Sequence, residues 1–172
     1  MNPSPAPSVF EPRFDADRER PGFTYRRARV GRQAGSERLG ASVYEIPPGE
    51  STFPYHFHVA NEEMLIVLSG RPDLRIPEGW RRLAEGELVA FPVGERGAHQ
   101  LHNGTGEPAR VLMVSEMRAP ELSFYPDSGK VLAGDRPPGG IADEEGLLFG
   151  SFRLADEVDY WEGEAPPERE SR

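Results

Sequence analysis

Three of the four histidines in this chain, together with one glutamate, have the types and spacing of metal ligands. His56 and His58 are separated by one residue, and in a β-strand this spacing points both imidazoles to the same side. Glu63 begins an apolar run, and His99 follows a second apolar run and its turn. Imidazole nitrogens combined with a carboxylate bind divalent transition metals such as Zn, Mn, Fe or Ni. We therefore expect His56, His58, Glu63 and His99 to hold one such ion.

An ion held by these four side chains would keep coordination positions free for water, a chelating oxygen substrate or dioxygen. A divalent ion polarises carbonyl groups and acidifies bound water, which supports isomerase, lyase, hydrolase or, with iron, oxygenase chemistry. Glu63 would then be a ligand and not a free base. Tyr44 and Tyr55 are the candidates for a catalytic acid or hydrogen-bond donor, with packing in the core as the alternative role for each.

Other polar residues near these positions favour structural roles. Glu62 neighbours Glu63, but we expect it to be a surface turn residue. His102 lies on the opposite strand face from His99 by alternation, which favours a structural role over metal binding. Arg71 and Arg75 could bind an anionic substrate, with solvated positions as the alternative.

The elements that position these residues are expected to be short strands. Apolar runs at residues 39–46, 63–68, 87–91 and 109–115 are each bounded by proline, glycine or other turn residues. The chain has 18 prolines and 19 glycines in 172 residues, which suits many turns better than long helices. The spacing predicts an all-β sandwich or barrel.

The run at residues 63–68 is apolar at alternating positions on both of its faces. One face is expected to line the barrel interior. The other needs a cover, which could be a second sheet, the N-terminal arm or a partner subunit. This second apolar face and the long chain ends together predict a homodimer.

The flanks divide the chain into four predicted segments. Residues 1–22 form a flexible N-terminal arm, residues 23–118 the barrel, residues 119–161 a C-terminal extension that packs on the barrel, and residues 162–172 a disordered tail. Residues 117–148 are rich in Pro, Gly and Asp and are expected to be long loops. Residues 150–160 are expected to form a strand and a helical turn.

The composition disfavours several classes of protein. The net charge of −9 disfavours binding to nucleic acid, because an acidic surface repels phosphate backbones. The absence of cysteine excludes disulfides and thiolate ligands. We see no secretory signal and no apolar run long enough to span a membrane, so the cytoplasm is the default location.

The histidine pattern resembles the two motifs of the cupin superfamily. The first motif runs from Gly49 to Gly70 and the second from Gly86 to Asn103. The spacing departs from the superfamily pattern in two turns: six residues, where five are usual, precede His56 after Gly49, and four, where two are usual, separate Gly94 from His99. The resemblance covers residues 39–116 and implies a double-stranded β-helix, the jelly-roll barrel, with these four ligands. The segments at 125–130 and 159–164 resemble uncharacterised members of the superfamily.

The resemblance leaves three functions open. The first is a metalloenzyme of isomerase, lyase or oxygenase type that acts on a small oxygen-rich metabolite. The second is a non-catalytic barrel that binds or senses a small molecule. The third, a metal-free structural barrel, is disfavoured by the intact ligand set. Neither flank shows a helix-turn-helix pattern, which argues against a transcription regulator.

Overall fold

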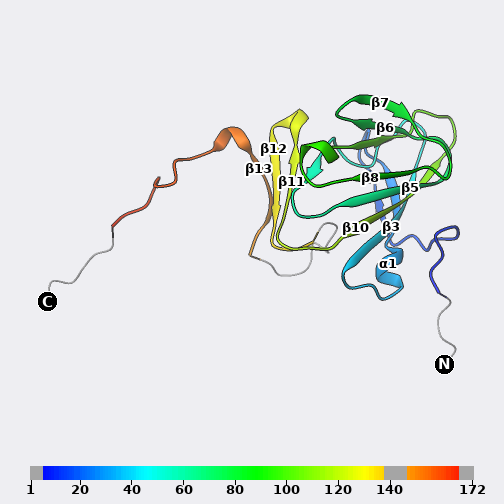
Figure 1. The fold of residues 1–172 in the computed structure, drawn as a ribbon, viewed down its shortest axis with the longest axis horizontal. Helices are drawn as coiled ribbons and strands as arrows, with labels where there is room; N and C mark the ends of the chain where they lie inside the picture. The colour runs from blue at the N-terminus through cyan, green and yellow to red at the C-terminus, as the bar shows by residue number, and fades with distance from the viewer. Residues whose placement is uncertain (1–5, 138–146, 167–172) are drawn as a thin grey trace.

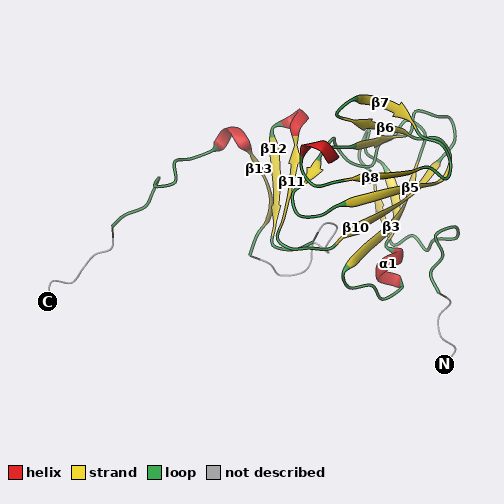
Figure 2. Cartoon of the chain, viewed as in Figure 1, coloured by secondary structure: helices red, strands yellow, loops and turns green. Residues whose placement is uncertain are grey.

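The protein is built almost entirely of antiparallel strands, which confirms the expected all-β class (Figures 1 and 2). The computed structural model describes residues 6–137 and 147–166. Its elements are β1 (Ala16–Arg18), β2 (Tyr25–Ala28), α1 (Val30–Gln33), β3 (Leu39–Ile46), β4 (Phe57–His58), β5 (Glu63–Ser69), β6 (Asp73–Ile76), β7 (Gly79–Arg82), β8 (Leu88–Phe91), η1 (Glu95–Gly97), β9 (Gln100–His102), β10 (Ala109–Glu116), β11 (Glu121–Tyr125), η2 (Pro126–Ser128), β12 (Lys130–Gly134), β13 (Phe149–Arg153) and η3 (Leu154–Asp156).

The strands form three antiparallel sheets. The largest has the order β1-β2-β3-β10-β5-β8, the second β13-β12-β11-β4, and the third β7-β6-β9. In Figure 1 the β6–β7 hairpin lies across the top of the body, and the β11–β13 sheet stands at one side of it. Strands far apart in sequence are therefore neighbours, as β3 and β10 show by pairing along their whole length.

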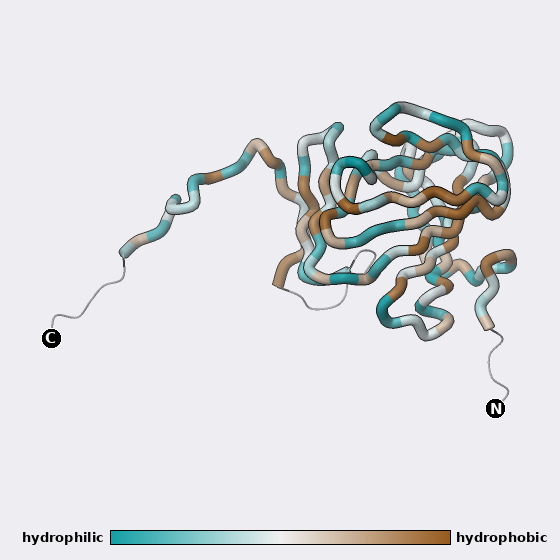
Figure 3. Tube along the Cα trace, viewed as in Figure 1, coloured by the Kyte–Doolittle hydropathy of each residue, from teal (hydrophilic) through white to brown (hydrophobic). Residues whose placement is uncertain are grey.

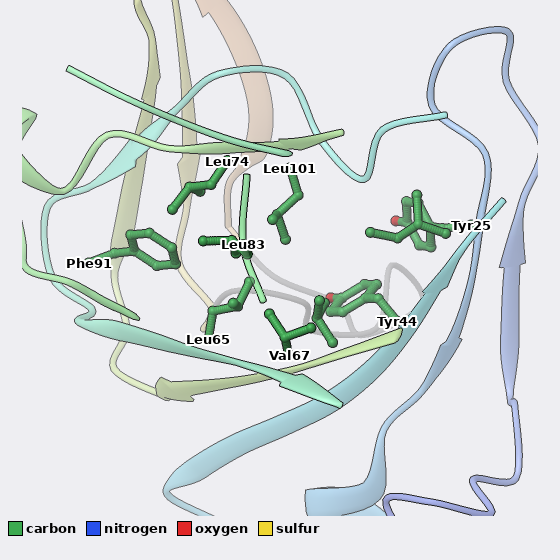
Figure 4. Close-up of a cluster of buried hydrophobic side chains, with 10 residues drawn as sticks. Tyr25, Tyr44, Leu65, Val67, Leu74, Leu83, Phe91 and Leu101 are labelled. Carbon is green, nitrogen blue, oxygen red and sulfur yellow. The ribbon is translucent and has the colours of Figure 1, made fainter. Parts of the chain in front are cut away.

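The core lies between the largest sheet and the β6 sheet. Leu65 and Val67 of β5 point inward and are almost fully buried, whereas Met64 and Ile66 point outward and are half-buried. The inward residues meet Leu74 and other side chains of the opposite wall in one cluster (Figure 4). Full burial of such a side chain is worth about 1.5–3 kcal/mol, so this interior stabilises the barrel.

The outer face of the largest sheet is covered by the N-terminal arm and α1. Ala28, Val30 and Val43 form a second buried cluster, against which Val9 and Phe14 of the arm are packed. Leu68 of β5 also joins this cluster, together with Leu112. The arm is thus one cover of the second apolar face. Figure 3 shows further hydrophobic positions at β13 and in the segment beyond it.

The expectation of long loops at residues 117–148 was wrong in part. The segment contains β11 and β12, which form a hairpin around η2 and Gly129, a residue with a left-handed φ of 59°. The two strands are short and lie between Pro, Gly and Asp residues, so the composition of the segment indicated loops and the strands were not predicted. Residues 138–146 and 167–172 lie outside the described residues.

The expected strand and helical turn near residues 150–160 correspond to β13 and η3. Strand β13 pairs with β12, but the described residues from 154 to 166 are exposed and extend away from the body (Figure 1). No helix among the described residues is long and apolar enough to cross a membrane.

Candidate metal centre

The four side chains singled out by the sequence converge inside the barrel. An antiparallel bridge joins His56 to His99, with backbone hydrogen bonds of 3.1 and 2.9 Å. His58 lies in β4, and Glu63 is the first residue of β5. The Glu63 Oε2 atom is 3.4 Å from Nε2 of His58 and 3.4 Å from Nε2 of His99. One ligand atom from each of His56, His58 and Glu63 lies within 4.8 Å of the others.

The outer nitrogens of two imidazoles are held by backbone carbonyl groups. Nδ1 of His56 is 2.9 Å from the Pro54 oxygen, and Nδ1 of His99 is 2.9 Å from the Gly97 oxygen. A carbonyl only accepts hydrogen bonds, so each Nδ1 carries the hydrogen and donates it. Each Nε2 therefore keeps its lone pair, which is the arrangement of metal-binding histidines in proteins.

His58 is held from the other side by the C-terminal sheet. Its Nδ1 lies 3.1 Å from the Ser123 hydroxyl oxygen and 3.6 Å from Glu121 Oε1. Only the first distance is within normal hydrogen-bond range, so Ser123 is the direct partner and the Glu121 carboxylate is the nearby negative charge.

The spacing of the inner atoms fits a bound transition metal. Ligand atoms that lie 2.0–2.2 Å from one ion are about 2.8–3.1 Å apart at octahedral angles of 90° and about 3.3–3.6 Å apart at tetrahedral angles. The distance of 3.4 Å from the Glu63 oxygen to Nε2 of either His58 or His99 falls within the tetrahedral range. Three imidazoles and one carboxylate, all buried, are a suitable donor set for Zn, Mn, Fe or Ni.

Charges inside the cluster prepare two of these groups for binding. Burial, together with the charges of His99 and His58, lowers the pKa of His56 to about 3 and keeps this imidazole neutral. Burial alone would raise the pKa of Glu63, but its interactions with His58 and His99 outweigh burial and hold that pKa far below its ordinary value. Glu63 is therefore ionised at neutral pH.

His58 differs from the other imidazoles. Burial lowers its pKa, but hydrogen bonding and the charges of Glu121 and Glu63 outweigh burial and raise the pKa of His58 to about 9. A metal ion must displace this proton to reach the His58 nitrogen, so metal binding at neutral pH releases a proton.

The unusual motif spacing before His99 is absorbed by η1. The Gly94 amide donates to the His58 carbonyl at 2.8 Å, and residues 95–97 then form one 3-10 turn. A Cβ atom at Gly97 would overlap the carbonyl oxygen of Pro92, so only glycine fits there. The turn brings the Gly97 carbonyl to His99, and the ligand geometry survives the longer loop.

Strand β11 forms a wall of the site that the sequence analysis missed. Glu121, Ser123 and Tyr125 alternate along one face of the strand, toward the histidines. Glu121 accepts hydrogen bonds from the Val59 amide, at 3.1 Å, and from the Asn61 side chain. The Tyr125 ring stacks on His56, with centroids 5.8 Å apart and planes 19° apart. The i, i+2, i+4 spacing of these residues was the one signal in the sequence.

The two predicted catalytic tyrosines lie away from the cluster. Tyr44 belongs to the hydrophobic core and packs edge-on against Phe53, 5.7 Å between centroids. Burial outweighs a hydrogen bond with Arg27 and raises the pKa of Tyr44 to about 12. Tyr55 lies under the Arg75 guanidinium, 4.0 Å from its ring centroid. No hydrogen bond within residues 6–137 and 147–166 joins either phenol to the four clustered side chains.

Three neighbouring polar residues that the sequence analysis considered lie outside the cluster. Glu62 is exposed. His102 contacts the Ser51 hydroxyl at 3.1 Å and is not part of the cluster. Arg75, a candidate for anion binding, is held by two contacts of 2.6 and 3.0 Å to Asp127.

Sequence comparison finds one matching family model. A family model described as a cupin domain matches residues 42–115, and this range contains all four clustered side chains. The chain carries a cupin domain. The match ends before β11, so the wall of the site formed by Glu121, Ser123 and Tyr125 lies outside the matched cupin range.

Solved structures show the same fold. A protein of Acidithiobacillus ferrooxidans, provisionally described as a sugar phosphate isomerase, is 26% identical with a TM-score of 0.69, over 81% of this chain and 82% of that one. A sugar phosphate isomerase of Silicibacter pomeroyi from a cupin superfamily is 23% identical with a TM-score of 0.73, over 88% of this chain and 94% of that one. The search of curated proteins found no match to this chain. These likenesses confirm the double-stranded β-helix.

Proposed function

We propose that this cupin is a metalloenzyme that binds one divalent transition metal through His56, His58, Glu63 and His99. The observation that carries the proposal is the convergence of the three imidazoles on one buried carboxylate. When bound, a divalent ion would polarise a carbonyl or hydroxyl oxygen of a substrate.

The chain's own residues position and shield this site. The carbonyl groups of Pro54 and Gly97 fix the orientation of two imidazoles. The Phe91 ring stacks on His99, with centroids 3.9 Å apart, and excludes water from that side. Tyr125 covers His56 from the opposite sheet.

We further propose that the substrate is a small oxygen-rich molecule of the sugar phosphate type and that the reaction is an isomerisation. Support comes from the relative in Acidithiobacillus ferrooxidans, the more similar in sequence of the two solved structures reported above. An aldose–ketose isomerisation moves a proton between carbons next to a polarised carbonyl, which suits a site of this chemistry.

The test is elemental analysis of protein that was purified without a chelating tag. We expect about one metal ion per chain in the parent and far less in His58→Ala and Glu63→Ala, because each variant loses one of four ligands. Glu62→Ala is the matched control, since it removes the adjacent, exposed carboxylate and should keep the parent's metal content.

A parent chain that stays free of metal after reconstitution with Zn, Mn, Fe and Ni in turn would overturn the proposal. So would a Glu62→Ala variant that loses metal as completely as Glu63→Ala.

A further inference from the structure

Two cations lie side by side on the face of the C-terminal sheet that looks toward the metal centre. Tyr125 of β11 pairs with Lys130 of β12, and Lys130 pairs with Arg153 of β13. Residues directly opposite each other in an antiparallel sheet project to the same side. Ser123, which contacts His58, is on this same side of β11, so the row of Tyr125, Lys130 and Arg153 continues the wall of the site.

The row is close to the cluster and open to solvent. The Tyr125 ring contacts His56, and the Lys130 ammonium lies 5.7 Å from the Tyr125 ring centroid. One aromatic ring therefore separates the imidazole from the ammonium group. Lys130 and Tyr125 are half-buried and Arg153 is exposed, so an incoming anion can reach them.

A further cation, Arg18 of β1, belongs to the N-terminal part of the chain, and its guanidinium lies 6.0 Å from the Tyr25 ring centroid. Among the residues that the structure describes, Arg18, Lys130 and Arg153 form no ion pair with a carboxylate. Arg75 differs, because Asp127 already occupies its guanidinium.

This arrangement has a cost in the absence of a ligand. Like charges that lie directly opposite each other in a sheet repel, as Lys130 and Arg153 do. Local conflicts of this kind are typical of functional sites. In a chain of net charge −9, an anion that reaches this row would relieve the repulsion and form charge-assisted hydrogen bonds.

We propose that Lys130 and Arg153 form an anion subsite that binds the phosphate group of the substrate. The inference rests on the proposed function, because it places the reacting oxygens at the metal centre and the phosphate at the far side of Tyr125.

Lys130 is the only lysine of the chain, which makes a direct test practical. Reductive ¹³C-methylation labels its amine and keeps the positive charge. Inorganic phosphate is then titrated into the full-length, metal-free protein and followed by the ¹³C signal of Lys130. Calorimetry on unlabelled Lys130→Gln and Arg153→Gln measures the affinity, and Arg71→Gln serves as the control at an exposed arginine outside the row.

We expect phosphate to shift the Lys130 signal and to bind about tenfold more weakly to Lys130→Gln and Arg153→Gln, since each loses a charge-assisted contact. Arg71→Gln should keep the parent's affinity, and acetate should bind more weakly than phosphate. Equal phosphate affinity in the parent and Lys130→Gln, or acetate binding as tight as phosphate, would overturn the subsite. Loss of metal binding in the parent would instead overturn the proposed function, because the phosphate titration uses metal-free protein.

Discussion

Replacing Glu121 by glutamine tests whether β11 takes part in metal binding. The Glu121 carboxylate is almost fully buried, and its Oε1 atom is 3.6 Å from Nδ1 of His58. Glutamine has nearly the same shape but removes the negative charge. We predict that Glu121→Gln binds the metal more weakly although every ligand is still present, so that Glu121 acts as a positioning residue for His58.

The magnitude follows from the contacts of the carboxylate. Removal of a directly bonded outer partner of a metal-bound histidine reduces metal affinity about 10–100-fold. Because Ser123 is the direct partner and Glu121 is the nearby charge, we expect the lower end for Glu121→Gln, about tenfold or about 1.4 kcal/mol. Stability should also fall, because Glu121 accepts hydrogen bonds from the Val59 amide and the Asn61 side chain. The NH₂ group of glutamine cannot accept from one of these donors, and one lost buried hydrogen bond costs about 1–3 kcal/mol.

The assay must separate metal affinity from stability. Competition with a chelator gives the metal dissociation constant, thermal unfolding of the metal-free protein gives stability, and ¹⁵N NMR reports which nitrogen of His58 carries the proton. Glu116→Gln is the matched control, because Glu116 is a more exposed carboxylate that pairs with Arg118. Unchanged metal affinity and an unchanged His58 signal in a folded Glu121→Gln variant would refute the reasoning. A loss of the same size in Glu116→Gln would also refute it.

Two further predictions concern the core and the oligomeric state. Tyr44 is neutral in the fold, with its pKa raised to about 12, whereas an unfolded phenol ionises near 10. The free energy of unfolding should therefore fall by about 2 kcal/mol as the pH rises from 10 to 12. Denaturant unfolding should show this loss in the parent but not in Tyr44→Phe, and an equal loss in both would contradict the assignment. We also predict a homodimer, because Tyr160 and Trp161 are 82% and 70% exposed at the end of an apolar segment. Light scattering at micromolar concentration should give twice the 19.1 kDa chain mass. Deletion of residues 154–172 should lower the fraction of dimer. A monomeric mass for the parent would contradict the prediction.

The four clustered side chains could be predicted from sequence because most of their geometry is local. The i, i+2 spacing of His56 and His58 fixes their common side, and the alternation of β5 points Glu63 inward with Leu65 and Val67. Glu62 and Glu63 could be separated on spacing alone, and the structure agrees that only Glu63 is buried. The order of the two motifs then predicted that His99, which is distant in sequence, lies beside His56.

The outer partners of the histidines could not be predicted in the same way. Ser123 and His58 are 65 residues apart, and their contact depends on the register between β4 and β11. Strand β4 has only two residues, so neither its pairing partner nor its register is specified by a local pattern. For Tyr44 the sequence left both a chemical role and core packing open, and the structure places its side chain in the hydrophobic core cluster.

The cupin match and the C-terminal sheet therefore form one functional unit. The matched range contains the four clustered side chains. Strand β11 contributes the Ser123 hydroxyl, which contacts Nδ1 of His58, and the Tyr125 ring, which covers His56. Without β11, a buried imidazole nitrogen would lack a partner, at a cost of about 1–3 kcal/mol. The same strand leads directly to Lys130 and the proposed phosphate subsite. One sheet thus holds the orientation of His58 and carries the two cations of the proposed subsite, so the proposed function depends on residues beyond the matched range 42–115.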